Sequence, residues 1–508
     1  MNVRTFLDHW QLSENPFRAE EARHDPVFAR LGTGDTDHPD FEKILGDLDR
    51  PSTAIVFGEK GSGKTAIRLQ LERRIRDHNQ AAPDGRILLI AHDDLNPMLD
   101  RIALRLGVDE ASDEKEVLRA LRKIRIVDHM DGILHLAVIR LVDTILGTDA
   151  DPVLPADEAV NALRRDPQAR RNIMLLQALY DRDENAGART GRLRRLIRAS
   201  GNPMRVLHKA LLFVGWVPAA AFFIWAVFWL AATPSEPPQW SMYVFGALLA
   251  CWLVIIGAWL LGKGRLRMLA RRLSRRLRSV GRTPEQLAAS LSRMPPEDRR
   301  PEALPVDTGD GRRYEMFDRL RQVLGVLGCR GAVVVIDRVD EPTLVNGDAG
   351  RMRAIIWPLL NNKLLQQDGI GFKLLLPLEL RHELFRETSD FFQEARLDKQ
   401  NLVERLTWSG AMLYDLCSTR LNACRVEGAA TLTDLFTADV TRQDLVDALD
   451  QMQQPRDAFK LLYQCIQEHC GNVTQEQEQW RIPRHVLDVV RRQQAERVQM
   501  FHRGVRPA

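Results

Sequence analysis

The stretch Phe57-Gly58-Glu59-Lys60-Gly61-Ser62-Gly63-Lys64-Thr65 decides how the rest of the chain is interpreted. Before it, residues 52–57 form a short apolar, partly β-branched run that is typical of a buried strand, and after it residues 66–75 have helical periodicity. A glycine-rich loop between a strand and a helix can turn consecutive backbone N–H groups toward phosphate oxygens. The helix N-terminus adds a partial positive charge. The stretch therefore predicts a phosphate-binding loop.

The positions of this loop predict how ATP and Mg²⁺ would be held. The expected nucleotide-binding residues are Gly58, Glu59, Lys60, Gly61, Ser62, Gly63, Lys64 and Thr65. Lys64 is expected to reach the β- and γ-phosphates, and the Thr65 hydroxyl is expected to ligate Mg²⁺. The alternative is a glycine-rich turn that matches by chance, and the flanking strand and helix patterns argue against it.

Residues 331–341 form a β-branched run that ends in acidic residues. A carboxylate at the tip of a strand beside the loop strand can hold Mg²⁺ through water, and a second carboxylate nearby can orient the attacking water. Asp337 fits the first role, and either Asp340 or Glu341 fits the second. Without the glycine loop, the same run would indicate only a core strand that meets solvent.

Two arginines are further candidates near the γ-phosphate. Residues 371–381 predict another strand, whose C-terminal end could present Glu379 or Arg381, although ordinary surface charges at the start of a helix would look the same. Arg456 follows Pro455, which favours the first turn of a helix. Because a cation is unfavourable at a helix N-terminus, a phosphate partner would explain Arg456.

The length of the chain and the spacing of its cysteines limit the number of domains and the cellular environment that we expect. A chain of 508 residues suggests two to four domains. The six cysteines show neither the dense spacing of a secreted scaffold nor a CxxC pair, which favours a reduced environment without a cysteine metal site. Residues 1–20 lack a basic region followed by an apolar run, so we expect no secretory signal and place any membrane segment inside the chain.

Two apolar stretches, residues 207–232 and 240–262, are each long enough to cross a hydrocarbon core of about 30 Å as a helix. Neither residues 211–232 nor residues 240–262 include a charged side chain, and six of the ten tryptophans lie in the pair. The proline-rich join between the stretches predicts a hairpin with a short external turn at Ser235. A buried hairpin in a soluble core is the alternative, but it leaves the uncharged length unexplained.

Basic residues flank the apolar pair on both sides. They are Arg189, Arg192, Arg194, Arg195, Arg198, Arg205 and Lys209 before it, and Lys263, Arg265, Arg267, Arg271, Arg272, Arg275, Arg276 and Arg278 after it. We therefore expect both ends of the hairpin to be cytoplasmic. Residues 265–280 also place leucines opposite the arginines, which favours a helix lying on anionic lipid headgroups. Nucleic acid is the less favoured partner of the same basic face.

The order of these features resembles that of the KAP-type P-loop NTPases, relatives of the STAND signalling ATPases. The resemblance rests on a glycine loop, a helical insertion carrying a transmembrane hairpin, and only then Ile-Asp-x-x-Asp-Glu at residues 336–341. Pro-Arg-Asp at residues 455–457 is similar to the sensor-2 element of AAA-type lids, and Arg338 stands where many relatives have a second acid. The resemblance implies an ATPase switch at the bacterial inner membrane, in a family with several members in anti-phage defence.

We therefore expect an α/β fold, with a P-loop NTPase (ASCE/AAA-like) parallel sheet core interrupted by a helical insertion with two transmembrane helices. The expected parts are a lead-in (1–50), a first core part (51–97), a helical insertion (98–206), the hairpin (207–262), a basic helix and linker (263–312), a second core part (313–400) and a C-terminal helical lid (401–508).

Lids of this kind place a neighbour's arginine at the nucleotide, so a homo-oligomer is expected, with Arg381 as the weaker candidate for that arginine. The leading interpretation is a membrane-anchored ATPase switch whose termini and ATPase core are cytoplasmic. Two alternatives stay open, an oligomeric transporter or channel and a membrane-tethered ATPase that handles nucleic acid.

Overall fold

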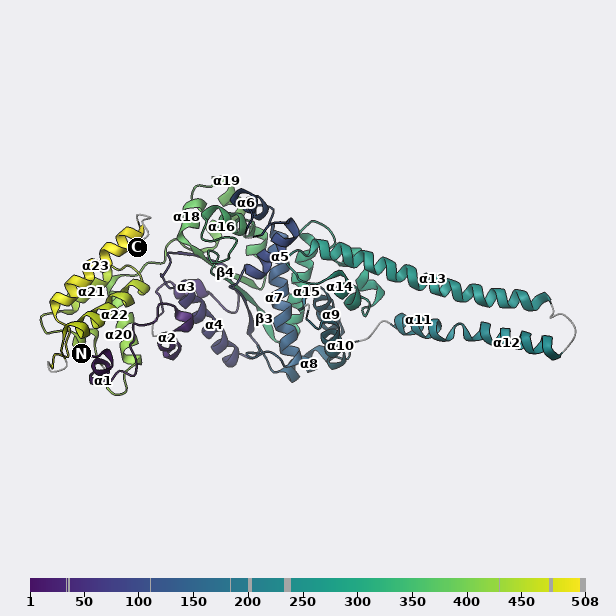
Figure 1. The fold of residues 1–508 in the computed structure, drawn as a ribbon, viewed down its shortest axis with the longest axis horizontal. Coiled ribbons are helices and arrows are strands. Elements are labelled where there is room, and N and C mark those ends of the chain that lie inside the picture. Colours follow the sequence, from purple (N-terminus) through teal and green to yellow (C-terminus); the bar gives the residue numbers. More distant parts are fainter. Residues whose placement is uncertain are drawn as a thin grey trace. The chain divides into compact units, whose positions relative to one another are not determined.

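The computed structural model describes residues 1–502, except residues 33, 35–36, 110, 183, 200–202, 233–238, 429 and 475–477. Within helices, the side chains of residues 203–206, 208–209, 230, 232, 239, 241–242 and 501–502 are also not described. The chain forms two compact units, one of residues 1–96 and 330–508 and one of residues 97–329 (Figure 1). The second unit is thus an insertion in the sequence of the first.

The first unit is built on a five-stranded parallel sheet in the order β2-β3-β4-β1-β5. The strands are β1 (Ala54–Gly58), β2 (Arg86–His92), β3 (Cys329–Ile336), β4 (Ile370–Pro377) and β5 (Asn401–Val403). Parallel pairing places Val56 of β1 opposite Leu375 of β4, and Val334 of β3 opposite Phe372 of β4. The α/β class and the parallel sheet expected from the sequence are confirmed.

The strand that ends in acidic residues is not the neighbour of the loop strand, so that expectation was wrong. β4 lies between β1 and β3. All eight residues of β4 are buried, and Lys373 is the one charged residue among them. A strand that is buried along its whole length is suited to the interior of a sheet that is covered on both faces. The tip of β3 is therefore two strand positions away from the glycine loop.

Helices cover the sheet and continue toward the C-terminus. Those of the first unit are α1 (Val3–His9), α2 (Pro26–Arg30), α3 (Phe41–Leu45), α4 (Lys64–Ala81), α16 (Ala349–Ile356), α17 (Asn362–Leu365), α18 (Leu378–Leu384), α19 (Ser389–Ala395), α20 (Gly410–Ala423), α21 (Arg442–Asp450), α22 (Pro455–Asn472) and α23 (Arg484–His502). Phe41 of α3 and Ile67 and Leu71 of α4 pack in one buried cluster with Val56 of β1. The glycine loop is thus supported by a packed strand and a packed helix.

Two boundaries in this unit differ from the sequence expectation. The N-terminal residues, expected as a polar lead-in, share a core with the C-terminal helices, because Phe6 and Phe17 are buried in the same cluster as Leu445 and Leu461. Residues 401–403, expected in the helical lid, form β5, where the Asn401 N–H donates to the Thr53 carbonyl at 3.1 Å. Neither contact is local in sequence, so periodicity could not predict it.

The second unit consists of helices. They are α5 (Asn96–Leu106), α6 (Glu114–Leu121), α7 (Ile126–Leu146), α8 (Ala156–Arg165), α9 (Pro167–Tyr180), α10 (Ala186–Leu196), α11 (Pro203–Val214), α12 (Val217–Ala232), α13 (Gln239–Arg276), α14 (Pro284–Leu291) and α15 (Gly311–Val326). Residues 283–311, expected as a linker, instead begin with α14, whose Leu287 and Leu291 are fully buried. Thr283 and Gln286 form a capping box that favours this helix.

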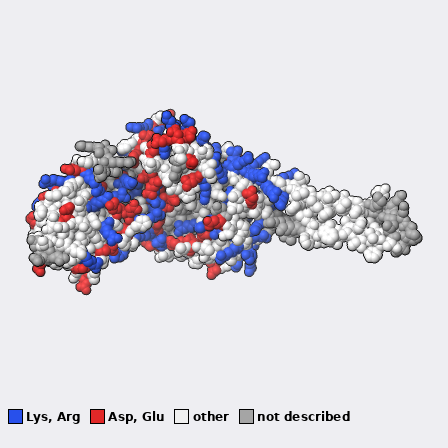
Figure 2. All heavy atoms as spheres, in the orientation of Figure 1, with Lys and Arg blue, Asp and Glu red and all other residues white. Residues whose placement is uncertain are grey.

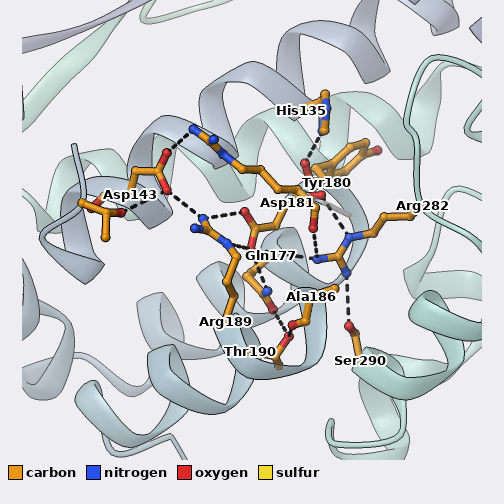
Figure 3. A network of polar contacts seen from close by, with 12 residues as sticks. His135, Asp143, Gln177, Tyr180, Asp181, Ala186, Arg189, Thr190, Arg282 and Ser290 are labelled. Atoms are coloured by element: carbon orange, nitrogen blue, oxygen red, sulfur yellow. Dashed lines mark hydrogen bonds and ion pairs between the residues drawn. The ribbon is translucent and has the colours of Figure 1, made fainter. Parts of the chain in front are cut away.

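A buried polar network ties the chain that follows α13 to the body of this unit (Figure 3). Arg282 is buried and donates to the Asp181 carbonyl at 3.0 Å and to the Ser290 hydroxyl at 3.1 Å. Arg189 bridges Asp143 and the Asp181 carboxylate, with a distance of 2.9 Å to each. Because a buried guanidinium is costly unless it is hydrogen-bonded, these contacts hold the segment after α13 in one position.

Two helical spans, residues 210–229 and 243–276, are long and apolar enough to cross a membrane by length and composition. Only 6% and 0% of their most apolar windows are buried, whereas the core helix of a soluble protein would be mostly buried. The alternative of a buried hairpin is therefore not supported. α12 and α13 run side by side (Figure 1), and the join at Ser235 lies outside the described residues.

The first span is not the single helix expected over residues 207–232. α11 ends at Val214 and α12 begins at Val217. Pro218 has no N–H with which to donate to the Val214 carbonyl, so the helical hydrogen-bond ladder is interrupted at this place.

The apolar face of residues 265–280 was expected to lie against headgroups, and for most of its length this was wrong. Leu273, Leu277 and Val280 are buried inside the second unit. The arginines on the other faces of the helix are exposed. The leucine pattern therefore marks a protein contact, while the basic residues face outward.

Candidate functional site

The glycine loop runs from the carboxyl end of β1 to the N-terminus of α4. Gly61 and Gly63 have φ angles of +100° and +96°, in the left-handed region that favours glycine. A Cβ atom on Gly61 would also come within 2.8 Å of the Gln454 side-chain oxygen. The loop backbone thus needs glycine at these two positions, as the sequence pattern indicates.

Lys64 folds back over the loop. Its Nζ donates to the carbonyl oxygens of Gly58 and Glu59, at 2.7 and 2.9 Å. Burial lowers the pKa of Lys64, and the carboxylates of Asp337 and Asp340 oppose that shift. The ammonium group is therefore held at the centre of the loop, beside two acids.

Asp337 comes directly after β3 and reaches the start of α4. Its Oδ2 accepts a hydrogen bond from the Thr65 hydroxyl at 3.2 Å, across 272 positions of sequence. Its Oδ1 is buried and has no hydrogen-bond partner among the described residues. Burial raises the pKa of Asp337, and the nearby charges of Lys64 and Arg68 counteract this. An unpartnered buried carboxylate oxygen marks a place where a cation would be favourable.

The oxygen atoms of Thr65 and Asp337 fit Mg²⁺, which takes oxygen ligands and usually keeps several waters. Among the described residues there is no group of three or more His, Cys, Asp or Glu side chains that could hold a metal ion. A cation at this place would therefore depend on water and on a bound anion for its remaining ligands.

Asp340 and Glu341 line the same cavity as Asp337. Glu341 pairs with Arg338 at 3.2 Å, and burial raises the pKa of Glu341. Arg338 has a φ angle of +55°, which is uncommon for a residue with a side chain. The left-handed backbone conformation of Arg338 turns the chain immediately after β3. Asp337, Asp340 and Glu341 consequently all line the same cavity.

Asp93 is a residue of this site that we did not predict from the sequence. It follows β2, and its Oδ2 lies 3.2 Å from a guanidinium nitrogen of each of Arg23, Arg68 and Arg338. The sequence pattern could have identified Asp93, because it follows a strand just as Asp337 does. The carboxyl ends of parallel strands share one edge of the sheet. Asp93 thus connects the N-terminal segment, α4 and the acidic loop.

A cavity of about 1010 Å³ joins these groups, at the upper end of the range for small-molecule sites. Its lining includes Lys64, Thr65, Asp337, Glu379 and Arg456. The Nε of Arg456 donates to the Glu20 carbonyl at 3.3 Å. This candidate cation therefore lines the cavity while it is hydrogen-bonded to the N-terminal segment. The structure therefore brings the loop, the acids and Arg456 to one space.

Arg381 does not share that space. It pairs with Glu404 at 2.8 Å, and its guanidinium lies 4.8 Å from the centre of the Phe385 ring. β4 ends at Pro377 and α18 follows at once, which turns Glu379 toward the cavity and Arg381 toward β5. Of the two alternatives for this position, Glu379 is the one that lines the cavity.

The sequence also gave no indication of how the chain beyond β5 contacts the loop. The Trp408 indole N–H donates to the Ser62 carbonyl at 2.8 Å. Glu59 pairs with Arg405 at 2.6 Å and accepts a hydrogen bond from Gln454. These are single residues without a local pattern, so only the fold identifies them.

Comparisons with known proteins add no family to this description, because no family model, no curated protein and no solved structure matches the chain.

Proposed function

We propose that this protein is a membrane-anchored ATPase of the KAP type that acts as a nucleotide-dependent switch. The observation that carries the proposal is the contact of Thr65 with Asp337, beside Lys64, at the mouth of a glycine loop. A strand, a glycine loop with two left-handed glycines, a helix and a distant strand-tip acid are the parts that phosphoryl transfer from ATP requires.

Each part has a chemical task in this proposal. The loop N–H groups and Lys64 bind the β- and γ-phosphates, and the N-terminus of α4 adds its partial charge. Thr65 and Asp337 would hold Mg²⁺, which neutralises charge that develops on the phosphate oxygens. Asp340 or Glu341 orients the attacking water, and Arg456 exchanges the Glu20 carbonyl for the γ-phosphate.

The hairpin supplies the membrane anchor in the same proposal. Its exposed apolar spans support insertion, and the basic residues on both flanks support a cytoplasmic location for both ends. The location is then the inner membrane of a bacterium. Uncharged spans offer no ion pathway within one chain, so we favour a switch over a channel.

We further propose a homo-oligomer. Arg381 lies outside the lining of its own chain's cavity, which suits a residue that acts at the nucleotide of a neighbour. Its present pairing with Glu404 would have to open for that purpose.

The decisive experiment is purification in detergent, with ATP hydrolysis and particle mass measured together. Lys64→Ala should abolish ATP binding and hydrolysis, because it removes the charge that holds the phosphates. The matched control is Lys399→Ala, which removes an exposed lysine of the same unit that does not line the cavity and should leave most of the activity. Equal activity of the parental protein and Lys64→Ala would overturn the proposal.

A further inference from the structure

The cytoplasm-facing part of α13 carries a group of cations without carboxylate partners. They are Lys263, Arg265, Arg267, Arg271, Arg272, Arg275 and Arg276, all exposed, and no described carboxylate forms an ion pair with any of them. The sequence explains this, since residues 237–284 contain no Asp or Glu. We call these seven residues the basic band, and Figure 2 shows Lys and Arg gathered where the uncharged hairpin begins.

The next arginines along the chain show that this lack of partners is specific to the band. Arg278 pairs with the buried Asp128, and Arg282 lies 3.9 Å from the Asp181 carboxylate. Cations needed for the fold of the second unit thus have internal acids. The band ends at Arg276, before the arginines that have internal acid partners, so its charge is available to an external anion.

The position of the band along α13 relative to a bilayer follows from the tryptophans. Trp240 and Trp259 lie 19 positions apart, which is about 28 Å of helix and close to the hydrocarbon thickness of about 30 Å. Tryptophan is enriched at both membrane interfaces. Lys263 lies over the Trp259 ring at 4.9 Å, so the hydrocarbon boundary falls next to Lys263.

From this boundary, six of the seven band residues form two sets by height, and Arg271 lies between the sets. With a rise of about 1.5 Å per residue, Arg265 and Arg267 lie about 3 and 6 Å beyond Lys263, inside a headgroup layer of about 5–7 Å. Arg272 lies about 14 Å beyond it, and Arg275 and Arg276 about 18–20 Å. A tilt of about 20° shortens these heights by only about 6%.

We propose that the inner set, Lys263, Arg265 and Arg267, is a binding site for the headgroups of anionic phospholipids. The inference rests on the proposed insertion of the hairpin. In the outer set, Arg275 and Arg276 lie more than a screening length of about 8 Å from the headgroup layer at physiological salt, and Arg272 lies about one screening length from it, so this set contributes less to lipid binding than the inner set. A nucleic acid would instead engage the outer set, which stands clear of the membrane.

The test uses the full-length protein in phosphatidylcholine vesicles that contain a trace of spin-labelled lipid. We compare the association of labelled phosphatidylglycerol with that of labelled phosphatidylcholine. The parental protein should prefer the anionic lipid by at least about fivefold, the ratio expected if only one of the three basic residues acts on a given lipid. Replacing Lys263, Arg265 and Arg267 together by Gln should bring the ratio close to one.

The matched control removes the same charge from the same helix, through Arg272→Gln, Arg275→Gln and Arg276→Gln together, and it should keep the preference. All six side chains are exposed, so both variants should fold and retain ATPase activity in detergent. A parental ratio near one, or an equal loss in both variants, would overturn the lipid site.

Two further measurements distinguish a missing lipid site from a failure of membrane insertion and from binding of nucleic acid. Resistance to carbonate extraction reports insertion, so an extracted protein would contradict the membrane anchor itself, whereas an inserted protein without lipid preference would contradict only the lipid site. Salt-dependent binding of DNA in detergent that is lost with the outer set would assign the band to nucleic acid instead.

Discussion

Arg456 lies in the first turn of α22, where its positive charge is opposed by the helix dipole. The backbone carbonyl of Glu20 accepts one hydrogen bond from it, which leaves most of the guanidinium free for an anion in the cavity. A γ-phosphate would use both the charge and the remaining donors of this side chain.

Arg456→Ala should therefore lower ATP hydrolysis about a hundredfold, a typical effect of removing one donor to developing charge, and change ADP affinity much less. The matched control is Lys460→Ala, one turn further along α22, because Lys460 also lines the cavity and pairs with Glu20 at 2.9 Å. Steady-state hydrolysis and ADP titration measure both effects. Similar losses in the two variants would show that Arg456 only fixes the N-terminal segment.

Lys373 is a buried cation in β4, away from the cavity. Its Nζ donates to the carbonyls of Leu45 and Ser52 at 2.9 and 2.8 Å, and burial lowers the pKa of Lys373 to about 7. A lysine in the unfolded chain titrates near 10.4. Between these two values the unfolded chain holds more protons, so the free energy of unfolding should rise with pH, by about 1.4 kcal/mol per pH unit.

Lys373→Met should remove this rise between pH 7 and pH 9, as measured by thermal unfolding of the detergent-purified protein. The control is Lys43→Met, because Lys43 also donates to a backbone carbonyl, that of Leu402, but is exposed. The control should keep the parental slope. If Lys373→Met keeps it as well, Lys373 is charged in the folded protein throughout this range.

At the scale of elements, local patterns predicted what is local. The run before Gly58 is β1, the run after Lys64 is α4, and the run before Asp337 is β3. The insertion of β4 between β1 and β3 and the pairing of β5 with β1 depend on contacts between segments far apart in sequence. Periodicity carries no information about such contacts, and the same limit hid Trp408, whereas Asp93 could have been predicted as an acid that ends a strand.

The hairpin is the element whose assignment most needs an experiment, because length and composition support it and its turn lies outside the described residues. Ser235→Cys should react with a membrane-impermeant maleimide on intact cells, since the proposed turn faces the outside. Arg321→Cys, at an exposed position of α15, should react only after lysis. Labelling of both positions on intact cells, or of neither before and after lysis, would contradict the hairpin topology.

At the scale of the whole molecule, the connection between the two units lies at two adjacent strands. The chain leaves the sheet after β2 and returns through β3. Asp93 follows β2 at the end from which the chain leaves for the second unit, whereas Asp337 follows β3 at the end remote from that unit. If the site binds nucleotide as proposed, the chain joins it to the second unit directly after β2 and, across the length of β3, before that strand.

Amide variants of Asp340 and Glu341 would separate ATP binding from ATP turnover. Asp340→Asn together with Glu341→Gln keeps the shape and hydrogen bonding of both side chains while removing the charge that polarises water. Asp337 is unchanged and would still hold Mg²⁺ with Thr65, so ATP should bind and persist. Hydrolysis should fall at least a hundredfold, as is usual for loss of a general base, while nucleotide affinity stays within a few fold of the parental value.

The two classes of mechanism then differ in the cell. In a switch whose ATP-bound assembly is active, the amide variant should be trapped in the active state, and expression should be toxic or give a constitutive oligomer. In a motor or pump, which needs repeated turnover, the same variant should be as inactive as Lys64→Ala. Growth on induction and particle mass with ATP distinguish these outcomes, and hydrolysis at the parental rate would show that neither Asp340 nor Glu341 activates the water.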